Sequence, residues 1–348
     1  MTRQTWTAFV SAVAFITLAM LLAFVPIPFV NWSPGGAEDT LGEIDGKPII
    51  QISGIETYPT TGQLDMTIVA STPVDSRLSL PQALLYYWLP SRDSLPRDSV
   101  YSPGKSAEQL QAEDTEMMET SKDAAVVAAL QAANEEVTAM PVVYSVTISG
   151  PAHTRLQPAD LVVSVDGVAT PDKESVGREV RRHRIGEEIT FVVLRNKEQV
   201  EVNVTTASSP TQPGVPVVGI TVDTGYLYEP EISFELGQEI GGPSAGLVFA
   251  VAIYDKITEG ALLDGKHIAG TGTMTPNGDV GGIGAIQEKI AAAESEGATA
   301  FLVPEANCPD LAGLDTKMTL IRVETLRDAV GALRDLHAPD RSAFIPRC

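Results

Sequence analysis

The N-terminal stretch Trp6–Val25 constrains this chain most, because its 20 residues carry no charge. As a helix, the stretch would be about 30 Å long, which matches the thickness of the hydrocarbon core of a bilayer. No charged residue occurs between Arg3 and Glu38, and Pro26 follows the apolar run directly. We therefore predict a membrane-spanning helix within residues 1–30.

The charges beside this helix predict its orientation. Arg3 and the amino terminus are the nearest positive charges, which favours a cytoplasmic N-terminus and an extracytoplasmic remainder. A cleaved signal peptide is the alternative, but its apolar core usually has about 7–15 residues before a small-x-small site. The run here is longer and leads into VPIPFVNWSPGG, which has no clear site of that kind. We expect an uncleaved, single-pass anchor in the cell membrane.

Composition excludes several classes of function. The chain has 348 residues, 44% of them hydrophobic, which allows roughly two domains of about 150 residues each. A net charge of -21 argues against binding to nucleic acid or anionic lipid, since both need basic surface. Cys308 and Cys348 are the only cysteines, and without a Cys/His cluster we expect no metal site. In an oxidising compartment they can form a disulfide, and two separate thiols are the alternative.

Residues 31–136 show three patterns. The segments 48–55 and 63–71 have the composition of two strands, joined by a YPTTG turn. The proline-containing segment 80–118 has no regular period. An alanine-rich stretch with a polar start predicts a helix over 121–136.

Residues 137–208 have the pattern of a small β-rich module. Strand-like segments surround one predicted helix at 173–183 and end in a hairpin over 188–206. The stretch LQPADLVVSVDGVAT resembles a segment of the PDZ domains of bacterial proteases, with Ala159 where glycine is usual. The resemblance implies binding of peptide C-termini by strand addition. A purely structural spacer is the alternative.

Residues 209–348 alternate strands and helices, so the whole chain is expected to be mixed α+β. One helix is predicted over PSAGLVFAVAIYDKI, with Pro243 in its first turn, where the missing N–H costs nothing. A second is predicted over AIQEKIAAAESEG and should stop at Gly297.

Ser244 is a candidate nucleophile because it follows two glycines at the predicted start of a helix. A helix N-terminus presents unpaired N–H groups and a partial positive charge, which suit a nucleophile whose attack creates an oxyanion. The backbone amides of Gly242 and Ala245 are the candidates to stabilise that oxyanion. A simple helix cap is the alternative, since serine is common at that position.

A serine nucleophile needs a base, and the histidines offer little. Of His153, His183, His267 and His337, only His267 lies near the glycine-rich core, and no acidic residue has an obvious orienting position. Lys289 is flanked by Ile286 and Ile290 on a predicted helix. Burial lowers the pKa of a lysine and yields a neutral amine that can take the serine proton.

The segments GGPSAG and GGIGAIQEKIAAA together resemble the proteolytic domain of Lon-type proteases. The separation between Ser244 and Lys289, 289 − 244 = 45 residues, fits the family pattern. The resemblance implies Ser244 as nucleophile, Lys289 as general base, and a threonine that assists the lysine. Thr271, Thr273 and Thr275 are all candidates for that threonine. The family also implies a homo-oligomer.

Taken over nearly its whole length, the chain resembles the membrane-anchored, PDZ-containing Lon-like proteases of bacteria. The expected organisation has an anchor within 1–30 and the start of the Lon-like domain in 31–136. The PDZ-like module covers 137–208 and the catalytic part covers 209–348. The module would then be an insertion in the Lon-like domain, and three domains in series are the alternative.

The expected function is an ATP-independent, extracytoplasmic serine endopeptidase that acts on unfolded or flexible protein substrates. The sequence has no G-x-x-x-x-G-K-[ST] motif, so no nucleotide cofactor is expected. One alternative is a non-catalytic binding protein that recruits or regulates another protease. A second alternative is an enzyme that uses a Ser–His arrangement with His267.

Overall fold

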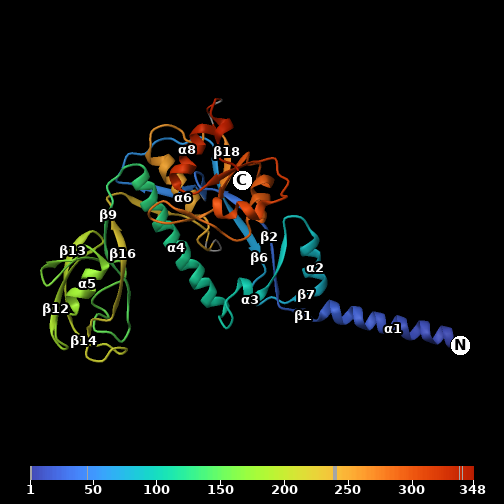
Figure 1. Ribbon diagram of the computed structural model, residues 1–348, viewed down its shortest axis with the longest axis horizontal. Coiled ribbons are helices and arrows are strands. Elements are labelled where there is room, and N and C mark those ends of the chain that lie inside the picture. The colour runs from blue at the N-terminus through green and yellow to red at the C-terminus, as the bar shows by residue number, and fades with distance from the viewer. Residues whose placement is uncertain (1, 45, 238–240, 337, 339) are drawn as a thin grey trace. The chain divides into compact units, whose positions relative to one another are not determined.

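The computed structural model describes residues 2–44, 46–237, 241–336, 338 and 340–348. It contains two compact units (Figure 1). The first unit consists of the residues up to Asn134 together with Glu231–Cys348, and the second is Glu135–Pro230. The second unit therefore lies, along the sequence, between two stretches of the first.

The N-terminal helix α1 (Arg3–Phe24) lies close to the predicted span. Its mean hydropathy is 2.3 and none of its residues is buried, so its length and composition suit a membrane span. A secretory signal sequence meets the same two criteria.

The rest of the first unit is a mixed α/β fold. Before the second unit it comprises β1 (Pro26–Ile27), β2 (Phe29–Asp39), β3 (Glu43–Ile44), β4 (Lys47–Pro48), β5 (Ile50–Ser53), β6 (Gln63–Ser71), β7 (Leu78–Ser79), α2 (Leu80–Trp88), β8 (Asp93–Pro96), α3 (Arg97–Val100) and α4 (Ala107–Ala132). After it follow β17 (Glu231–Phe234), α6 (Gly246–Ile257), β18 (His267–Gly270), β19 (Thr273–Met274), β20 (Val280–Gly281), α7 (Ile286–Glu296), β21 (Ala300–Pro304), the 3₁₀ helix η1 (Glu305–Leu311), β22 (Thr319–Val323), α8 (Leu326–Leu336) and the 3₁₀ helix η2 (Ser342–Phe344).

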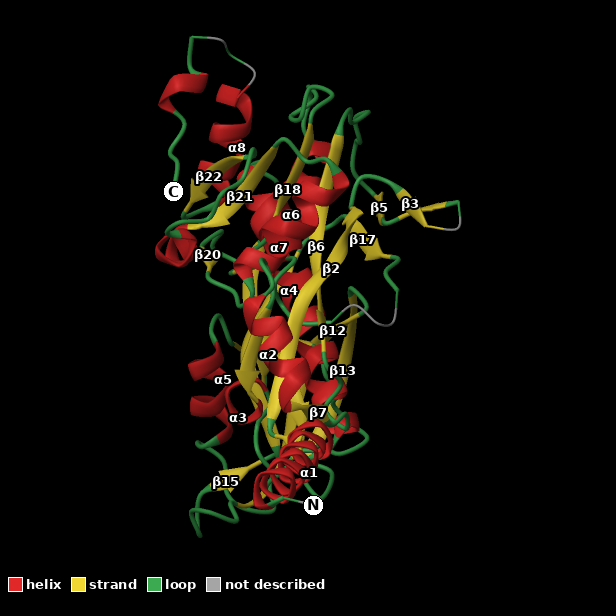
Figure 2. Cartoon of the chain, turned by 90° about the vertical axis from the view of Figure 1, so that its right-hand side faces the viewer, coloured by secondary structure: helices red, strands yellow, loops and turns green. Residues whose placement is uncertain are grey.

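The main sheet of this unit has the strand order β22-β21-β18-β6-β2-β8, and its first five strands lie side by side in Figure 2. The four strands from β22 to β6 are parallel, whereas β2 and β8 run antiparallel to their neighbours. Helix α6 packs against α4 and α8, and α7 packs against β2 and β6. The predicted helix stop at Gly297 is confirmed.

The predicted pairing of segments 48–55 and 63–71 is wrong. Strand β5 pairs with β17, and β6 instead pairs with β2, a strand that was not predicted from the sequence. Pro34 and the glycines after it hid this strand, because such residues usually mark turns. In the structure the register shifts between Pro34 and Gly36. At Gly35 a side chain would meet the Ala70 nitrogen at 2.7 Å, so glycine is required there.

The segment 80–118, predicted to be irregular, contains α2, β8, α3 and the first half of α4. Helix α4 starts at Ala107 rather than at residue 121, and it ends at Ala132. The Ser106 hydroxyl accepts the Gln109 N–H and the Gln109 side chain accepts the Ser106 N–H. This capping box starts the helix in a charged stretch that has no hydrophobic period to reveal it.

The second unit is a β-rich fold with one helix of its own. It comprises β9 (Thr138–Val146), β10 (Leu161–Val165), β11 (Val168–Ala169), α5 (Lys173–Val180), β12 (Glu188–Arg195), β13 (Glu198–Thr205), β14 (Ala207–Ser208), β15 (Pro216–Val217) and β16 (Ile220–Leu227). Its sheet order is β13-β12-β10-β9-β16, and its core includes Val143, Ile189 and Phe191. The unit continues to Pro230, past the expected boundary at 208, because β16 pairs with β9.

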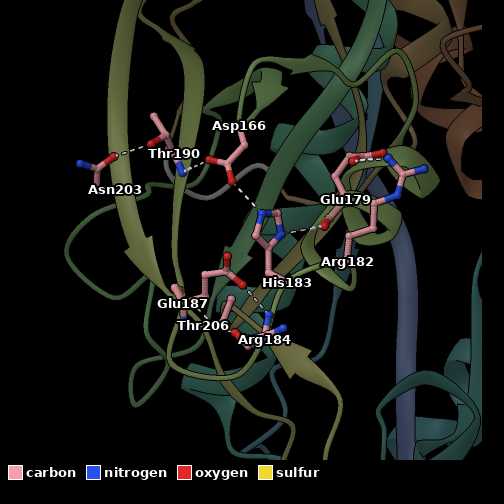
Figure 3. A network of polar contacts seen from close by, with 9 residues as sticks. All are labelled: Asp166, Glu179, Arg182, His183, Arg184, Glu187, Thr190, Asn203 and Thr206. Atoms are coloured by element: carbon pink, nitrogen blue, oxygen red, sulfur yellow. Dashed lines mark hydrogen bonds and ion pairs between the residues drawn. The ribbon is translucent and has the colours of Figure 1, made fainter.

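A network of polar contacts connects the end of α5 to the sheet of this unit (Figure 3). His183, just after α5, places one ring nitrogen 2.7 Å from the Asp166 carboxylate and the other 3.0 Å from the Glu179 carbonyl. The same carboxylate accepts the Thr190 N–H of β12. These contacts give His183 a structural role inside the second unit.

Ala159 has a φ of +71°, a left-handed conformation that costs a residue with a Cβ about 1–2 kcal/mol. We expect Ala159→Gly to stabilise the second unit by about 1 kcal/mol. Amide hydrogen exchange in β9 and β10 reports this local free energy.

Ala152→Gly is the matched control, because Ala152 is fully buried and does not have a positive φ. That change removes a buried methyl group and should destabilise the same amides. Equal destabilisation by both changes would contradict the assignment of strain to Ala159.

Candidate active site

Ser244 lies just before α6, not in its first turn as the sequence predicted. The helix starts at Gly246, because the Pro243 carbonyl makes no α-helical hydrogen bond. It accepts the Ser121 hydroxyl at 2.9 Å and, in a tighter turn, the Gly246 N–H at 3.5 Å. The Leu247 N–H, its expected donor, donates to the Gly272 carbonyl at 3.1 Å. The serine is thus in a turn held by α4 and by the segment after β18.

Two further hydrogen bonds fix the Ser244 backbone. Its carbonyl accepts the Thr271 hydroxyl at 3.0 Å and the Gly272 N–H at 2.8 Å. The next glycine, Gly246, permits the close packing: a Cβ there would lie 2.7 Å from the Ser121 hydroxyl oxygen and 2.9 Å from Met274. The backbone around the nucleophile candidate is therefore held from both sides.

Lys289 reaches Ser244 from the first turns of α7. Its Nζ lies 2.9 Å from the Ser244 Oγ and 2.9 Å from the Thr67 carbonyl oxygen of β6. The side chain is only 6% exposed. Burial lowers the pKa of Lys289 from its ordinary value of 10.5 to about 8.

The pair opens into a cleft of about 300 Å³. Its walls come from β2, β6, α4, the Ser244 turn and the start of α7, and its lining residues are Trp32, Met66, Thr67, Ile68, Val69, Ser71, Gln111, Asp114, Met118, Gly241, Ser244, Ala245, Gly284, Ala285 and Lys289. Gln111, Asp114 and Met118 follow a helical i, i+3, i+7 spacing, so one face of α4 forms a wall. Burial, helped by the neighbouring Glu113 charge, raises the pKa of Asp114.

The predicted threonines do not contact the lysine amine in the described part of the chain. Thr271 is buried and bonds to the Ser244 carbonyl, and Thr275 bonds to Asp279. Thr273 pairs with Gly281 in β19. The oxygen that holds the lysine amine beside Ser244 is the backbone carbonyl of Thr67.

The two predicted oxyanion amides differ in their contacts. The Gly242 N–H donates to the Asp114 carbonyl at 3.1 Å, so in this conformation it is not available to an oxyanion, which corrects the prediction for Gly242. Ala245 lies at the edge of the cleft, next to Ser244.

The histidines lie elsewhere in the described residues. The His267 Nε2 contacts the buried Asp65 carboxylate at 2.6 Å, at the start of β18. Thr271, which contacts the Ser244 carbonyl, is four residues further along the chain. At the rise of a β-strand this separation corresponds to about 13 Å. His153 and His183 are in the second unit, and His337 lies outside the described residues.

Cys308 and Cys348 form a disulfide that links η1 to the C-terminal residue. Beside Cys308, the Asn307 side chain accepts the Ile283 N–H and donates to the Ile283 carbonyl, both at 2.9 Å. Ile283 belongs to the loop that leads into α7. The disulfide therefore links the C-terminal residue to η1, whose Asn307 holds the loop that precedes the helix of Lys289.

Sequence reasoning missed Thr67, Ser121 and Asp114. All three lie more than 100 residues before Ser244 in the sequence, and only the folded chain brings them to the site. Ser121 was the first residue of the predicted helix, but nothing in its neighbourhood indicated a bond to a carbonyl 122 positions away.

Two family models match the chain, a PDZ domain over residues 119–206 and the Lon protease (S16) C-terminal proteolytic domain over residues 238–333. The PDZ match begins within α4, which belongs to the first unit, and stops before β16. The strand pairing gives the better boundary, because β16 completes the sheet of the second unit.

Curated relatives agree with the second match. The chain is 43% identical over 70 residues to a Lon protease of Roseiflexus castenholzii and 34% identical over 110 residues to Lon protease 2 of Syntrophobacter fumaroxidans. These alignments cover 20% and 30% of this chain but only 8% and 14% of the relatives.

Among solved structures, the PDZ domain of an SdrC-like protein from Listeria monocytogenes is 20% identical, with a TM-score of 0.22. The match covers 24% of this chain and 86% of that one. From the two family models and the Lon relatives, the chain carries a PDZ domain and a proteolytic domain of the Lon (S16) family.

Proposed function

We propose that this chain is an ATP-independent serine endopeptidase in which Ser244 is the nucleophile and Lys289 is the general base. The observation that carries the proposal is the 2.9 Å contact between the Ser244 Oγ and a lysine amine whose pKa burial lowers to about 8. A buried lysine with a purely structural role would not be expected to contact a serine hydroxyl that lines an open cleft.

The chemistry follows from the two contacts of the amine. A neutral amine donates one hydrogen to the Thr67 carbonyl and turns its lone pair toward the Ser244 hydroxyl. The Ser244 oxygen attacks the substrate carbonyl as its proton moves to Lys289. The ammonium then protonates the leaving amine, and the C–N bond breaks to give an acyl-enzyme. Lys289 next takes a proton from water, whose oxygen attacks the ester carbon. It returns that proton to the Ser244 oxygen as the ester C–O bond breaks, which restores the serine hydroxyl and the neutral amine.

The developing oxyanion needs hydrogen-bond donors. The Ala245 N–H lies next to the nucleophile in the turn before α6, and we assign it to this role. The Gly242 N–H could join it only after releasing the Asp114 carbonyl. These steps use the groups of the chain and water, so we propose no metal ion and no nucleotide cofactor.

The edge of β6 supports an extended substrate. Strand β18 pairs with β6 only as far as Met66, whereas β2 continues to Ser71 on the other side. In the described part of the chain no strand pairs with the remaining edge, and Ile68 and Val69 line the cleft there. A peptide can add to this edge as a strand, which requires an unfolded or flexible segment.

The remaining assignments extend the proposal. Helix α1 would anchor the chain as a single-pass protein of the cell membrane, with the catalytic unit on the extracytoplasmic side. The PDZ domain would bind protein or peptide C-termini and so recruit substrates or partners. Assembly into a homo-oligomer rests on the likeness to Lon proteases.

Asp114 gives the cleft a charge preference. It is the one acidic side chain among the described lining residues, and Lys289 is neutral when it acts as a base. A half-buried carboxylate attracts a cation more strongly than an exposed one, since less water screens it. We therefore assign to the enzyme a preference for lysine or arginine close to the scissile bond.

Replacing either member of the pair tests the activity. Ser244→Ala and Lys289→Ala should each lower kcat on an unfolded protein by at least about 10³-fold, because each removes an indispensable group. Cleavage of a casein-type substrate measures this loss.

Ser295→Ala and Lys256→Met are matched controls for these two changes. The Ser295 hydroxyl donates to the Ala292 carbonyl within α7, and Lys256 is another lysine whose pKa burial lowers. Both variants should cleave normally. Parental activity in Ser244→Ala or Lys289→Ala would favour the alternative of a non-catalytic binding protein.

The pKa of Lys289 predicts the pH dependence. Labelling of Ser244 by a serine-reactive phosphonate should rise as pH increases through about 8 and then level off, because the neutral amine is the reactive form. Lys289→Met should not be labelled at any pH. A labelling rate that falls as pH rises through that value would contradict the role of Lys289.

The free energy of unfolding of Lys289→Met measures the cost of burying the lysine amine. Between about 8 and 10.5 the unfolded state binds more protons than the folded state, so the stability of the parent rises with pH across that window. Near neutral pH, Lys289→Met should be more stable than the parent by up to about 3 kcal/mol.

Asp114→Asn tests the charge preference. The ratio of kcat/KM for a peptide with lysine near the scissile bond to that for its norleucine analogue should fall roughly tenfold, or about 1.4 kcal/mol. The control is Glu113→Gln, which removes the neighbouring charge that pairs with Lys105 and leaves the cleft lining unchanged. Equal effects from the two changes would show that the preference comes from the overall negative charge of this region and not from direct contact between the substrate and Asp114.

A further inference from the structure

Helix α2 (Leu80–Trp88) presents an apolar face to the surroundings. Leu84 and Leu85 lie one turn before Trp88, at the i, i+1 and i+4 spacing of a single helix face, with Tyr87 beside them. Leu85 is 54% exposed, Tyr87 69% and Trp88 74%. Contiguous exposure of large apolar side chains marks a surface that contacts a partner or a membrane.

The helix is fixed on the domain by its opposite side. Ala83 is buried, Tyr86 is half-buried, and the Arg92 guanidinium lies 5.1 Å from the centre of the Tyr86 ring. Helix α2 also packs against β2 and β8 of the main sheet. The exposed face is thus a defined part of the folded unit.

The segment around α2 carries no charged side chain. No charged residue occurs between Arg77 and Arg92, although the whole chain has a net charge of -21. A protein partner recognised by charge would find no complementary group on this face. Its two aromatic side chains, one with a hydroxyl and one with an indole N–H, have an apolar body and a polar tip.

The fold places α2 beside the end of α1. Strand β1 (Pro26–Ile27) follows α1 after Val25 and pairs with β7 (Leu78–Ser79), with Pro26 opposite Ser79. Helix α2 starts at the next residue. Paired Cα atoms lie about 5 Å apart, so α2 begins within roughly 10 Å of the last residues of the apolar helix. Figure 1 shows α1, β7 and α2 together at that end of the unit.

We propose that α2 is a membrane-interface helix that lies on the same bilayer leaflet from which α1 emerges. Leu84 and Leu85 enter the boundary of the acyl chains, while Tyr87 and Trp88 lie among the headgroups, where these two residue types are enriched. At nine residues the helix is about 14 Å long and fits the plane of the interface. The proposal rests on the membrane anchoring of α1 given above.

The partner is the bilayer itself, and the attraction comes from apolar burial. The face has no cationic side chain, so it does not require anionic lipid. Together with α1 it would attach the catalytic unit to the membrane at two points. The orientation of the cleft relative to the bilayer would then be fixed rather than free to rotate about one linker.

The three tryptophans allow a direct test, since Trp6 is in α1, Trp32 lines the cleft and Trp88 is on α2. Three full-length chains that each keep one tryptophan, with phenylalanine at the other two positions, are reconstituted in zwitterionic phosphatidylcholine vesicles. Bromine atoms on the upper acyl chain quench only an indole that reaches the interface. We expect Trp88 to lose most of its emission and to shift to the blue, with Trp32 unchanged.

The Trp6 chain separates failure of this inference from failure of the anchor. Quenching at Trp6 with Trp88 behaving like Trp32 would overturn the interface role of α2 and leave the anchor standing. An unquenched Trp6 would overturn the anchor, and the inference with it.

A variant checks that the face itself makes the contact. In the Trp88 chain, Leu85→Glu places a charge on the face and should restore the emission of Trp88. Phe344→Glu is the control, because Phe344 is 82% exposed but belongs to η2 near the C-terminus. Unaltered quenching in Leu85→Glu would contradict the proposal.

Discussion

The contact between the Lys289 amine and the Ser244 hydroxyl is the interaction on which the rest of the site depends. Keeping this amine out of water lowers its pKa from 10.5 to about 8, which corresponds to a cost of about 3 kcal/mol to the folded state. The Thr67 carbonyl accepts a hydrogen bond from the amine, which offsets part of that cost. A cavity filled by an aliphatic side chain would be more stable, so packing alone does not explain a lysine here, whereas the proposed role as general base does.

The site is assembled from segments that are far apart in the sequence. Thr67 belongs to β6, Ser121 to α4, Ser244 to the turn before α6, and Lys289 to α7. The PDZ domain falls between the second and third of these segments along the chain. An insertion there leaves the contacts between α4 and the Ser244 turn intact, because they are made by residues that flank it. The first unit can therefore keep one site although its sequence is interrupted.

Much of this could be predicted from the sequence, and the failures have identifiable causes. The Ser244 and Lys289 segments were recognisable because their short patterns and their separation reflect local requirements. Strand β2 was missed because its Pro34 and glycines resemble a turn, and the early half of α4 because its exposed surface lacks an apolar period. The Thr67 carbonyl could not be found, since any residue type supplies a backbone oxygen. The start of α6 depended on a side chain from α4, which no local rule includes.

The disulfide between Cys308 and Cys348 gives the site a dependence on where the chain folds. Asn307, next to Cys308, holds both backbone groups of Ile283, three residues before α7 begins. A chain that folds under reducing conditions lacks the cross-link, and η1 is then held by non-covalent contacts alone. Oxidation would add a covalent constraint on η1 and, through Asn307, on the loop before α7. With the proposed extracytoplasmic location, the cross-link would form only after the chain has crossed the membrane.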